Sequence, residues 1–412
     1  MAKVYLDIDS PAFQKFPIAV TDFQSRTSGP GSEGLSQGLA DRLGHYLDVT
    51  GFFNVISRKA FLEDPRKAGI LPGTFRFDDW SAIGSEFLVK GSFAVTGTEL
   101  DIEARLFDVV KGEVLVAKGY KGRKDKPEEL LRRFASDILM ALTGEGGVFD
   151  TKIAFVMKSK GKGDIYSVLF DGTERQRLTS HQSILYAPRW SPDGRMLAFT
   201  SYKDGTPDLY VQDLATRRIR KLIDYGGINL AGSWSPDGRR LLVTLSKDGN
   251  EEIYVLDTSS YQLRRLTFSA SIDISPAWSP DGTRIAFVSN RGGSPQIYLM
   301  NTDGSNVRRL TFEGNYNTSP SWSPRGKRLA FEGMAGGRFQ IFTIDEDGSN
   351  LLQLTFDRDD NESPTWSPDG RYIVYSSRRG GGRIQVMNVN GTNVRTLQDG
   401  GATSPSWSPR LK

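Results

Sequence analysis

The sequence predicts an all-β C-terminal region, folded as a six-bladed β-propeller, preceded by a smaller N-terminal α/β domain. The segment WSPDG, read as WSPRG in one copy, recurs with its tryptophan at positions 190, 234, 278, 322 and 366, a constant spacing of 44 residues. A fixed period of this length is typical of solenoids and propellers. Each repeat contains four short runs rich in β-forming residues, separated by turn residues, and four strands per repeat indicate a propeller blade.

One repeat, residues 276–312, shows why the runs are read as strands. Pro280 restricts φ, Asp281 can bond its own backbone and Gly282 tolerates positive φ, so Ser-Pro-Asp-Gly forms a turn. The expected strands after this turn are Ile285–Ser289, Ile297–Leu299 and Val307–Phe312. The first is apolar without alternation, as in a strand covered on both faces. The repeated tryptophan is therefore expected to pack between neighbouring blades.

The ends of the repeat region predict how the ring closes. The first blade-like unit, Lys152–Thr179, has three expected strands and no tryptophan segment before it, whereas the last tryptophan segment, Ser404–Pro409, has no strands after it. We expect the last segment to supply the missing strand of the first unit, which pairs the open edges of the sheet. Six runs of the type IYxxDxxG support a count of six blades, at Asp164–Gly172, Asp208–Ala215, Glu252–Ser259, Gln296–Gly304, Gln340–Gly348 and Arg383–Gly391.

The N-terminal region lacks the repeat and reads as mixed α/β. Leucines spaced by four predict an amphipathic helix over Gly34–Val49, and Pro127 at a first turn predicts a second helix over Pro127–Leu142. A short helix capped by Asp78 or Asp79 is expected over Asp78–Ile83. The expected strands are Val4–Ile8, Ile18–Phe23, Phe52–Ile56, Phe87–Thr96, Leu100–Val109 and Val114–Tyr120. The expected domains are an N-terminal tail (1–16), the α/β domain (17–145) and the propeller (146–412), with the joint at Gly144–Gly147.

Composition excludes several classes of function. The 412 residues include 53 basic and 49 acidic side chains, and the basic ones are scattered without an aromatic stripe, which argues against nucleic-acid binding. The chain has no cysteine, so disulfides and cysteine metal sites are excluded. No apolar run approaches the roughly 18 residues of a membrane span. No secretory signal follows Met1, so we expect a cytoplasmic protein or a chain that starts at its mature end.

Three motifs that resemble catalytic or ligand sites are interpreted as structural. Residues 29–34 match GxGxxG, but no acidic residue follows the next strand to bind a ribose. Residues 34–38 match GxSxG, but Ser36 falls inside the expected helix, and the two histidines, His45 and His181, fall in different domains. Asp345–Gly348 lacks the later ligands of a calcium loop and is the expected blade turn. No catalytic residue is assigned, and the chain is not expected to be an enzyme.

A ring of candidate binding residues comes from the segments just before each tryptophan segment, because these vary while the segment itself does not. If the tryptophan segment is the innermost strand, these residues are loops around one mouth of the central channel. The set is small, polar and irregular, which suits the binding of a protein or peptide. The candidates are Tyr186, Ala187, Asn229, Leu230, Ala231, Asp273, Ile274, Ser275, Asn317, Thr318, Ser319, Asn361, Glu362, Ser363, Thr403 and Ser404.

Both domains together resemble the TolB family of periplasmic proteins from the Tol–Pal system of Gram-negative bacteria. In the N-terminal domain the resemblance rests on Val4–Ser10, Pro17–Gln24, Ser28–Gly31 and Phe87–Gly91, and in the propeller on the blade motifs and Ser404–Pro409. The chain departs from the pattern at Gly232, which replaces the proline of Pro-x-Trp, and at Arg325, which replaces the aspartate of WSPDG. Both are turn positions, so altered local geometry is expected there.

The resemblance implies a non-enzymatic adaptor of the cell envelope that supports outer-membrane integrity and invagination during cell division. It implies that the mouth binds the peptidoglycan-associated lipoprotein Pal and that colicins use the same channel. It also implies that an N-terminal segment binds the C-terminal domain of TolA. That segment would comprise Lys3, Val4, Tyr5, Leu6, Asp7, Ile8, Asp9, Ser10 and Pro11.

The remaining expectations concern location, cofactors and alternatives. The resemblance implies a periplasmic protein, consistent with a chain that starts at its mature end, and we expect a monomer. It implies no cofactor, although it admits calcium in the propeller channel, for which no ligands can be chosen. One alternative function is a propeller hydrolase or the propeller of a serine peptidase, which would need a hydrolase domain that the sequence does not contain. The other is an assembly platform with different partners.

Overall fold

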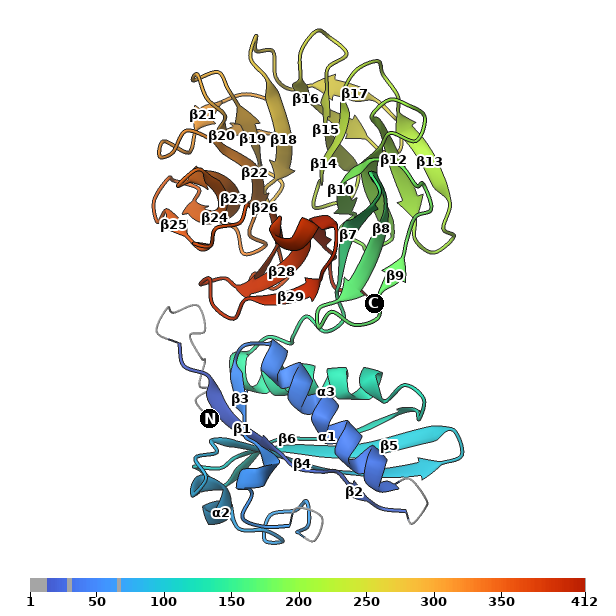
Figure 1. Cartoon of the computed structure of the whole chain (residues 1–412), viewed down its shortest axis with the longest axis vertical. Coiled ribbons are helices and arrows are strands. Elements are labelled where there is room, and N and C mark those ends of the chain that lie inside the picture. Colours follow the sequence, from blue (N-terminus) through green and yellow to red (C-terminus); the bar gives the residue numbers. More distant parts are fainter. Residues whose placement is uncertain (1–12, 28–31, 65–67, 412) are drawn as a thin grey trace. The chain divides into compact units, whose positions relative to one another are not determined.

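The computed structural model describes residues 13–27, 32–64 and 68–411 (Figure 1). The chain forms two compact units, Met1–Phe149 and Asp150–Lys412. Each unit has its own sheets and its own core, so we describe them separately. The expected strand Val4–Ile8 lies outside the described residues. The expected joint, Gly144–Gly147, lies within the first unit, just after its last helix.

The N-terminal unit is one mixed sheet with two long helices packed on it (Figure 1). The strand order is β3-β1-β4-β5-β6, with β2 also paired to β4, and β1 runs parallel to both of its neighbours. The elements are β1 (Phe16–Val20), β2 (Gln24–Ser25), α1 (Ser32–Val49), β3 (Phe53–Val55), η1 (Arg58–Ala60), α2 (Phe77–Ser81), β4 (Phe87–Thr96), β5 (Glu99–Asp108), β6 (Glu113–Arg123) and α3 (Pro127–Thr143).

The core of this unit follows the expected apolar periodicity. Leu39, Leu43 and Leu47 of α1 are fully buried, as are Phe134 and Ile138 of α3. Helix α3 begins at Pro127 and ends at Thr143, and its C-cap residue Gly144 adopts the left-handed conformation (φ 77°) that glycine allows. The two predicted long helices are therefore confirmed, as are the three consecutive strands expected between residues 87 and 120, which pair antiparallel as β4, β5 and β6.

Two local expectations are wrong. The strand expected over Ile18–Phe23 ends at Val20, because the chain turns to bury Phe23 over Gly91, where an added Cβ would lie 2.3 Å from the ring. Helix α2 begins at Phe77 with Arg76 as its N-cap and no capping side chain, so neither Asp78 nor Asp79 caps it.

The second unit is a closed ring of six four-stranded sheets, the blades of a propeller (Figure 1). Blade 1 is β30 (Ala402–Trp407), β7 (Lys152–Ser159), β8 (Lys162–Leu169) and β9 (Gln176–Arg177). Blade 2 is β10 (Leu185–Trp190), β11 (Met196–Ser201), β12 (Asp208–Asp213) and β13 (Ile219–Ile223). Blade 3 is β14 (Asn229–Trp234), β15 (Arg240–Leu245), β16 (Glu252–Asp257) and β17 (Leu263–Arg265).

The other three blades have the same antiparallel order. Blade 4 is β18 (Asp273–Trp278), β19 (Arg284–Ser289), β20 (Gln296–Asn301) and β21 (Arg308–Arg309). Blade 5 is β22 (Asn317–Trp322), β23 (Arg328–Ala335), β24 (Arg338–Asp345) and β25 (Leu352–Gln353). Blade 6 is β26 (Asn361–Trp366), β27 (Tyr372–Ser377), β28 (Arg383–Asn388) and β29 (Arg395–Gln398), with η2 (Arg379–Gly381) between β27 and β28.

The predicted closure of the ring is confirmed. Strand β30 pairs antiparallel with β7, placing Ala402 opposite Met157 and Trp407 opposite Ile153. The first strands of the six blades also contact one another in sequence around the ring, from β10 through β14, β18, β22 and β26 to β30 and back to β10. These strands are therefore innermost, as expected for the tryptophan segments.

The repeated tryptophans join neighbouring blades through a recurring hydrogen bond. The indole Nε1 of Trp322 donates to the carbonyl oxygen of Ala277 in the preceding blade, at 3.2 Å. The indoles of Trp190, Trp234 and Trp366 make the same bond to Ser406, Arg189 and Ser321. Trp407 instead donates to Thr151 Oγ1 at 2.8 Å, and the buried Nε1 of Trp278 has no partner within the described residues. The predicted packing of tryptophan between blades is confirmed.

The two departures from the repeat differ in their structural effect. At Arg325 the turn is kept, because Gly326 N still donates to Ser323 O, while Arg325 Nε reaches Asp369 O of the next blade at 2.7 Å. At Gly232 the strand itself changes, as described below for the mouth. The fourth strand of blade 4 is shorter than expected: β21 covers only Arg308–Arg309 of the expected Val307–Phe312.

We predict that Trp322→Phe destabilises the protein more than Trp278→Phe. Both substitutions keep an aromatic ring between blades, but only the first removes a hydrogen bond and leaves the buried carbonyl of Ala277 without its donor. The difference in the free energy of unfolding should be about 1 kcal/mol or more. Urea denaturation of the two variants measures it, and equal destabilisation would show that the indole bond contributes nothing to stability.

Candidate functional site

The predicted mouth residues lie in the first halves of the innermost strands β10, β14, β18, β22, β26 and β30. The expectation that they form loops is therefore wrong. Each strand buries its first residue, which comes from the set Leu185, Asn229, Asp273, Asn317, Asn361 and Ala402. Several of these residues hold the incoming connection in place: Asn317 Nδ2, for example, donates to Glu313 O and to Gln296 Oε1, both at 2.8 Å. Their side chains are thus part of the scaffold.

The side chains that follow these buried residues are at least partly exposed in most blades, so they can meet a partner. Tyr186 is 40% exposed, the largest aromatic surface on the innermost strands. The others with partial exposure are Ala187, Leu230, Ile274, Ser275, Thr318, Ser319, Glu362, Ser363, Thr403 and Ser404. Ala231 is buried, in contrast. The candidate contact set is therefore this subset of the predicted ring, which we call the mouth.

A backbone irregularity shapes the mouth in five of the six blades. Ala187, Ser275, Ser319, Ser363 and Ser404 adopt left-handed φ angles between 49° and 56°, and each precedes a proline. A β-bulge follows at the same place, which bends the strand and redirects its side chains. Non-glycine residues seldom adopt this conformation, and they cluster where structure serves function.

Blade 3 departs from this pattern at Gly232. Ala231 does not adopt a left-handed φ, and the bulge shifts along the strand to lie between Ala231 and Trp234. An added Cβ at Gly232 would lie 2.6 Å from Leu242 O and 2.8 Å from Pro276 Cγ of the next blade. A side chain there is therefore excluded by the backbone of β15 in the same blade and by Pro276 on the innermost strand of the next blade.

Three exposed phenylalanines lie in the connections that lead into the mouth. Phe268, Phe312 and Phe356 are between 71% and 77% exposed and recur at the blade spacing. Each ends a Leu-Thr-Phe sequence after the fourth strand, and the next residues lead to an innermost strand. These phenylalanines were missed in the reading of the sequence, because Phe312 was placed in a strand.

The two residues before each phenylalanine explain why its ring faces solvent. Leu310 is buried in the core, and Thr311 Oγ1 accepts the backbone N–H of Ile297 at 3.0 Å while donating to Gln296 Oε1. With both neighbours held inward, Phe312 points outward. Arg309 donates from Nε to Thr311 O, and its guanidinium lies 5.0 Å from the Phe312 ring centroid. Thr267 and Thr355 accept the equivalent backbone bond ahead of Phe268 and Phe356.

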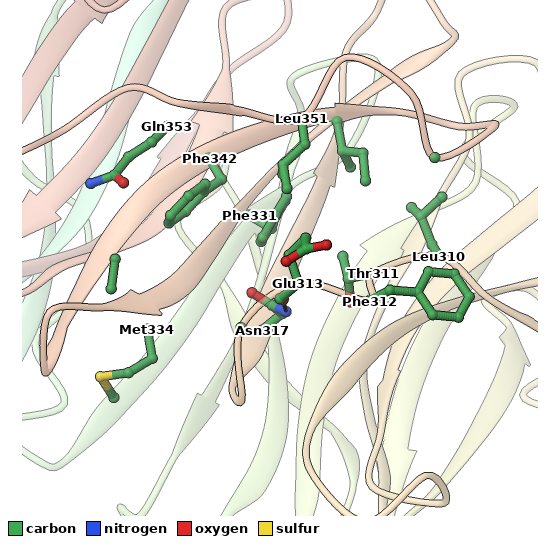
Figure 2. Close-up of a pocket in the computed structure, with 14 residues that line it drawn as sticks. Leu310, Thr311, Phe312, Glu313, Asn317, Phe331, Met334, Phe342, Leu351 and Gln353 are labelled. Carbon is green, nitrogen blue, oxygen red and sulfur yellow. Dashed lines mark hydrogen bonds between the residues drawn. The ribbon is translucent and has the colours of Figure 1, made fainter.

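A groove of about 600 Å³ lies between blades 4 and 5, beside one of these rings (Figure 2). Phe331, Met334 and Phe342 of blade 5 form one wall, and Leu310 and Phe312 of blade 4 contribute to the other. Figure 2 shows the polar side chains of Glu313 and Asn317 among these apolar groups. Because Asn317 begins strand β22, the groove lies next to the mouth.

A buried carboxyl group lies directly behind the mouth. Glu332 of β23 accepts the backbone N–H of Ser363 at 2.5 Å, from the innermost strand of blade 6. In blade 2 the equivalent side chain is Thr200, whose hydroxyl makes the corresponding bonds to blade 3. Burial raises the pKa of Glu332 to about 7, with a smaller contribution from the nearby Glu362.

The structure bears on the rejected motifs. Ser36 lies within α1 and donates to Phe23 O at 2.6 Å from a buried position, so it is not a nucleophile elbow. His181 Nδ1 lies 3.1 Å from Ser201 Oγ, but Ser201 is fully buried and inaccessible to a substrate. Asp347 accepts from Ser349 in a blade turn, as expected for Asp345–Gly348.

The described residues contain no group of three potential metal-ligating side chains, and calcium in the channel stays a prediction. In the same part of the chain, no helix has the length and apolarity needed to cross a membrane. The proposed TolA-binding residues, Lys3–Pro11, and the first half of the GxGxxG motif, residues 29–31, lie outside the described residues.

We predict that Glu332→Gln becomes more stable relative to the wild type as pH rises. The carboxyl pKa is about 7 in the folded protein and near 4.5 in the unfolded chain, so between these values the folded state binds more protons. Wild-type stability from this group is therefore present below about pH 4.5 and is lost as pH rises through about 7. Glutamine keeps an acceptor for Ser363 and does not titrate.

The relative stability should change by on the order of 3 kcal/mol across this window. Thermal or urea unfolding at several pH values measures it. Thr343→Val, at another buried position of blade 5, serves as a control that should show no such pH dependence. A stability difference between Glu332→Gln and the wild type that stays constant with pH would contradict the assignment.

Comparisons with known proteins agree with this architecture. The model of the TolB amino-terminal domain matches residues 4–115, and that of the TolB beta propeller domain matches residues 139–411. The crystal structure of TolB from Acinetobacter baumannii superposes with a TM-score of 0.85 at 28% identity, covering 96% of this chain and 97% of that one. A nidogen/laminin complex, at 14% identity and a TM-score of 0.53, shares the fold alone.

Curated relatives carry the same family name. A Tol-Pal system protein TolB from Syntrophus aciditrophicus is 49% identical over 213 residues, 51% of this chain and 47% of the relative. The protein of that name from Desulfosudis oleivorans is 44% identical, over 52% of this chain and 49% of the relative. The chain thus spans about half the length of the curated relatives it matches. Both domain models together cover most of the sequence, and the chain belongs to the TolB family.

Proposed function

We propose that this chain is a non-enzymatic adaptor of the Tol–Pal system, working in the periplasm. In this proposal the propeller mouth binds the lipoprotein Pal, and the segment Lys3–Pro11 binds the C-terminal domain of TolA. Through these contacts the protein supports outer-membrane integrity and invagination during division. Membership of a family whose relatives are named Tol-Pal system proteins supports the setting.

The observation that carries the mouth assignment is the set of outward-facing phenylalanines on blades 3, 4 and 5. Large exposed apolar side chains that recur on one side of a soluble protein mark interaction surfaces. Phe268, Phe312 and Phe356 all lie in connections entering the mouth, and the groove beside Phe312 can receive an apolar side chain. Aromatic anchors surrounded by small polar groups are typical of protein interfaces.

The mouth itself favours a protein ligand over a small substrate. Its exposed positions are mostly short hydroxyl or aliphatic side chains, with Tyr186 as an aromatic exception. Such a surface offers shape and scattered hydrogen bonds, which suit a protein segment. Colicins are proposed to use the same opening, on the strength of the family resemblance alone.

We predict that Phe268→Ser, Phe312→Ser and Phe356→Ser combined weaken binding of the soluble domain of Pal by tenfold or more. Loss of exposed aromatic anchors typically costs binding energy of about 1 kcal/mol or more each. Because the rings are exposed, the free energy of unfolding should change by only about 0.5 kcal/mol per site. Calorimetric titration and thermal unfolding measure the two quantities.

A control replaces exposed apolar residues at the opposite end of the outer strands, in blades 3, 4 and 6. Tyr261, Val307 and Val394 are exposed in the turns before the fourth strands, whereas the phenylalanines lie after them. The combined serine variant of these three should bind Pal like the wild type. If both triple variants lose binding equally, or neither does, the mouth side is not the binding surface.

Deletion of residues 3–11 should abolish capture of the TolA C-terminal domain and leave Pal binding by the propeller unchanged. The reason is that the two proposed epitopes lie in separate units, each with its own core. Affinity capture with the purified domains compares the deletion with the wild type and with the triple phenylalanine variant. TolA retained by the deletion variant would refute the assignment of the segment.

A further inference from the structure

One arginine stands out in the ring of innermost strands. Arg189 of β10 immediately precedes Trp190, and the equivalent position in every other blade holds a small residue. Those residues are Ser233, Ala277, Ser321, Thr365 and Ser406. Because each lies one residue before a repeated tryptophan, all six occupy the same level of the ring. Arg189 is therefore the one charged side chain at this level.

The guanidinium of Arg189 has no anionic partner among the described residues. Within this part of the chain its only hydrogen bond runs from Nη1 to the carbonyl oxygen of the adjacent Pro188, at 3.3 Å, so Nε and Nη2 bond to none of the described groups. The side chain is partly accessible to solvent, yet burial among protein atoms lowers its pKa to about 10, and no neighbouring charge offsets this effect. An isolated charge in such surroundings is costly unless a counterion accompanies it.

Three acidic groups in or next to the mouth are engaged elsewhere. Glu332 and Glu362 belong to blades 5 and 6, and blade 5 lies opposite blade 2 in a ring of six. Glu332 accepts from Ser363, and Glu362 pairs with Arg378 at 2.8 Å. Asp273 of blade 4 likewise pairs with Arg291, at 2.7 Å. The innermost strands thus carry an unmatched positive charge at Arg189, on the side of blade 2.

We propose that Arg189 forms an anion-binding site inside the ring of innermost strands, and that its ligand is a carboxylate. A guanidinium presents N–H donors in a planar fork that matches the two oxygens of a carboxylate. Ser321, which is partly exposed at the same level, offers a hydroxyl to the ligand, whereas Ser233 Oγ already accepts the backbone N–H of Trp278 at 2.7 Å. Because the other five positions at this level hold small uncharged residues, Arg189 is the side chain that would select a negatively charged ligand.

The carboxylate has two sources. It is either a free small anion or a carboxyl group on a protein segment that enters through the mouth, and the second source rests on the proposed function. Formate serves as the probe, because it presents the carboxylate with no further recognition element. Chloride at equal ionic strength separates specific binding from screening.

Formate should raise the melting temperature of the wild type above that in chloride, in proportion to the logarithm of its concentration once the site is occupied. Arg189→Met should lose this response, with affinity for formate reduced about tenfold or more. In chloride, this variant should melt no lower than the wild type, because it removes an unpaired charge and keeps the chain length. Arg195→Met removes an exposed arginine just after the same strand and should respond like the wild type.

Two results would overturn the proposal: a wild type that gains no stability in formate beyond chloride, or an Arg189→Met variant that gains as much as the wild type. Should Arg189→Met fail to fold, Arg189→Lys replaces it as the test. Lysine keeps the charge but lacks the planar fork, so formate should bind it several-fold more weakly. Undiminished binding by the lysine variant would contradict recognition by the guanidinium.

Competition between formate and Pal then shows whether the carboxylate is a free anion or belongs to the protein partner. If the carboxylate belongs to the partner, formate should weaken binding of the soluble domain of Pal to the wild type and have no effect with Arg189→Met. If it is a free anion, Pal binding should be insensitive to formate, although formate still stabilises the wild type. Failure of the wild type to bind Pal would refute the proposed function, while the formate response alone decides whether the anion site exists.

Discussion

Pairing of the last strand with the first sheet holds the propeller together. Strand β30 lies against β7 and completes blade 1, so residues more than two hundred positions apart share one ladder of hydrogen bonds. A ring closed in this way has no open side where an inner sheet edge could pair with another chain. It also places six innermost strands at one level around a common axis, and both the mouth and the Arg189 position exist only because of that closure.

Interactions between blades reinforce this closure and keep the strands in register. Most of the repeated tryptophans donate an indole N–H to a backbone carbonyl of the preceding blade. This bond fixes the position of each innermost strand relative to the innermost strand of the neighbouring blade. The positions near Gly232 are the exception. There a bulge is displaced, two innermost strands approach closely, and the indole of Trp278 lacks its bond. The repeat is thus least regular at the inner wall of blade 3.

The candidate functional residues of the propeller are of two kinds. Some occur where one blade departs from the repeated sequence, and others are side chains of the repeat that point to solvent. Glu332 occupies the position that Thr200 has in blade 2, and burial raises the pKa of its carboxyl group to about 7. Arg189 introduces a charge at a position where the other blades have small residues. Phe268, Phe312 and Phe356 are side chains of the repeat that point to solvent. Their leucine and threonine neighbours are committed to the core and to a strand, so the ring is presented to solvent without any special backbone strain.

The sequence by itself determined the architecture, because a constant spacing of tryptophan turns and a tail segment without a blade leave few other ways to bury the apolar strands. It also determined the helices α1 and α3, whose apolar faces and terminal residues are local signals. Tertiary structure decided what local signals do not encode. The mouth residues lie in strands, and the first side chain of each strand is buried. Phe312 is exposed because its neighbours contact the core and an adjacent strand. Arg189 is recognised as an unpaired charge only when the six equivalent positions are compared around the ring. Burial and pairing of charge are properties of the assembled ring, and for that reason they could not be predicted from spacing or composition.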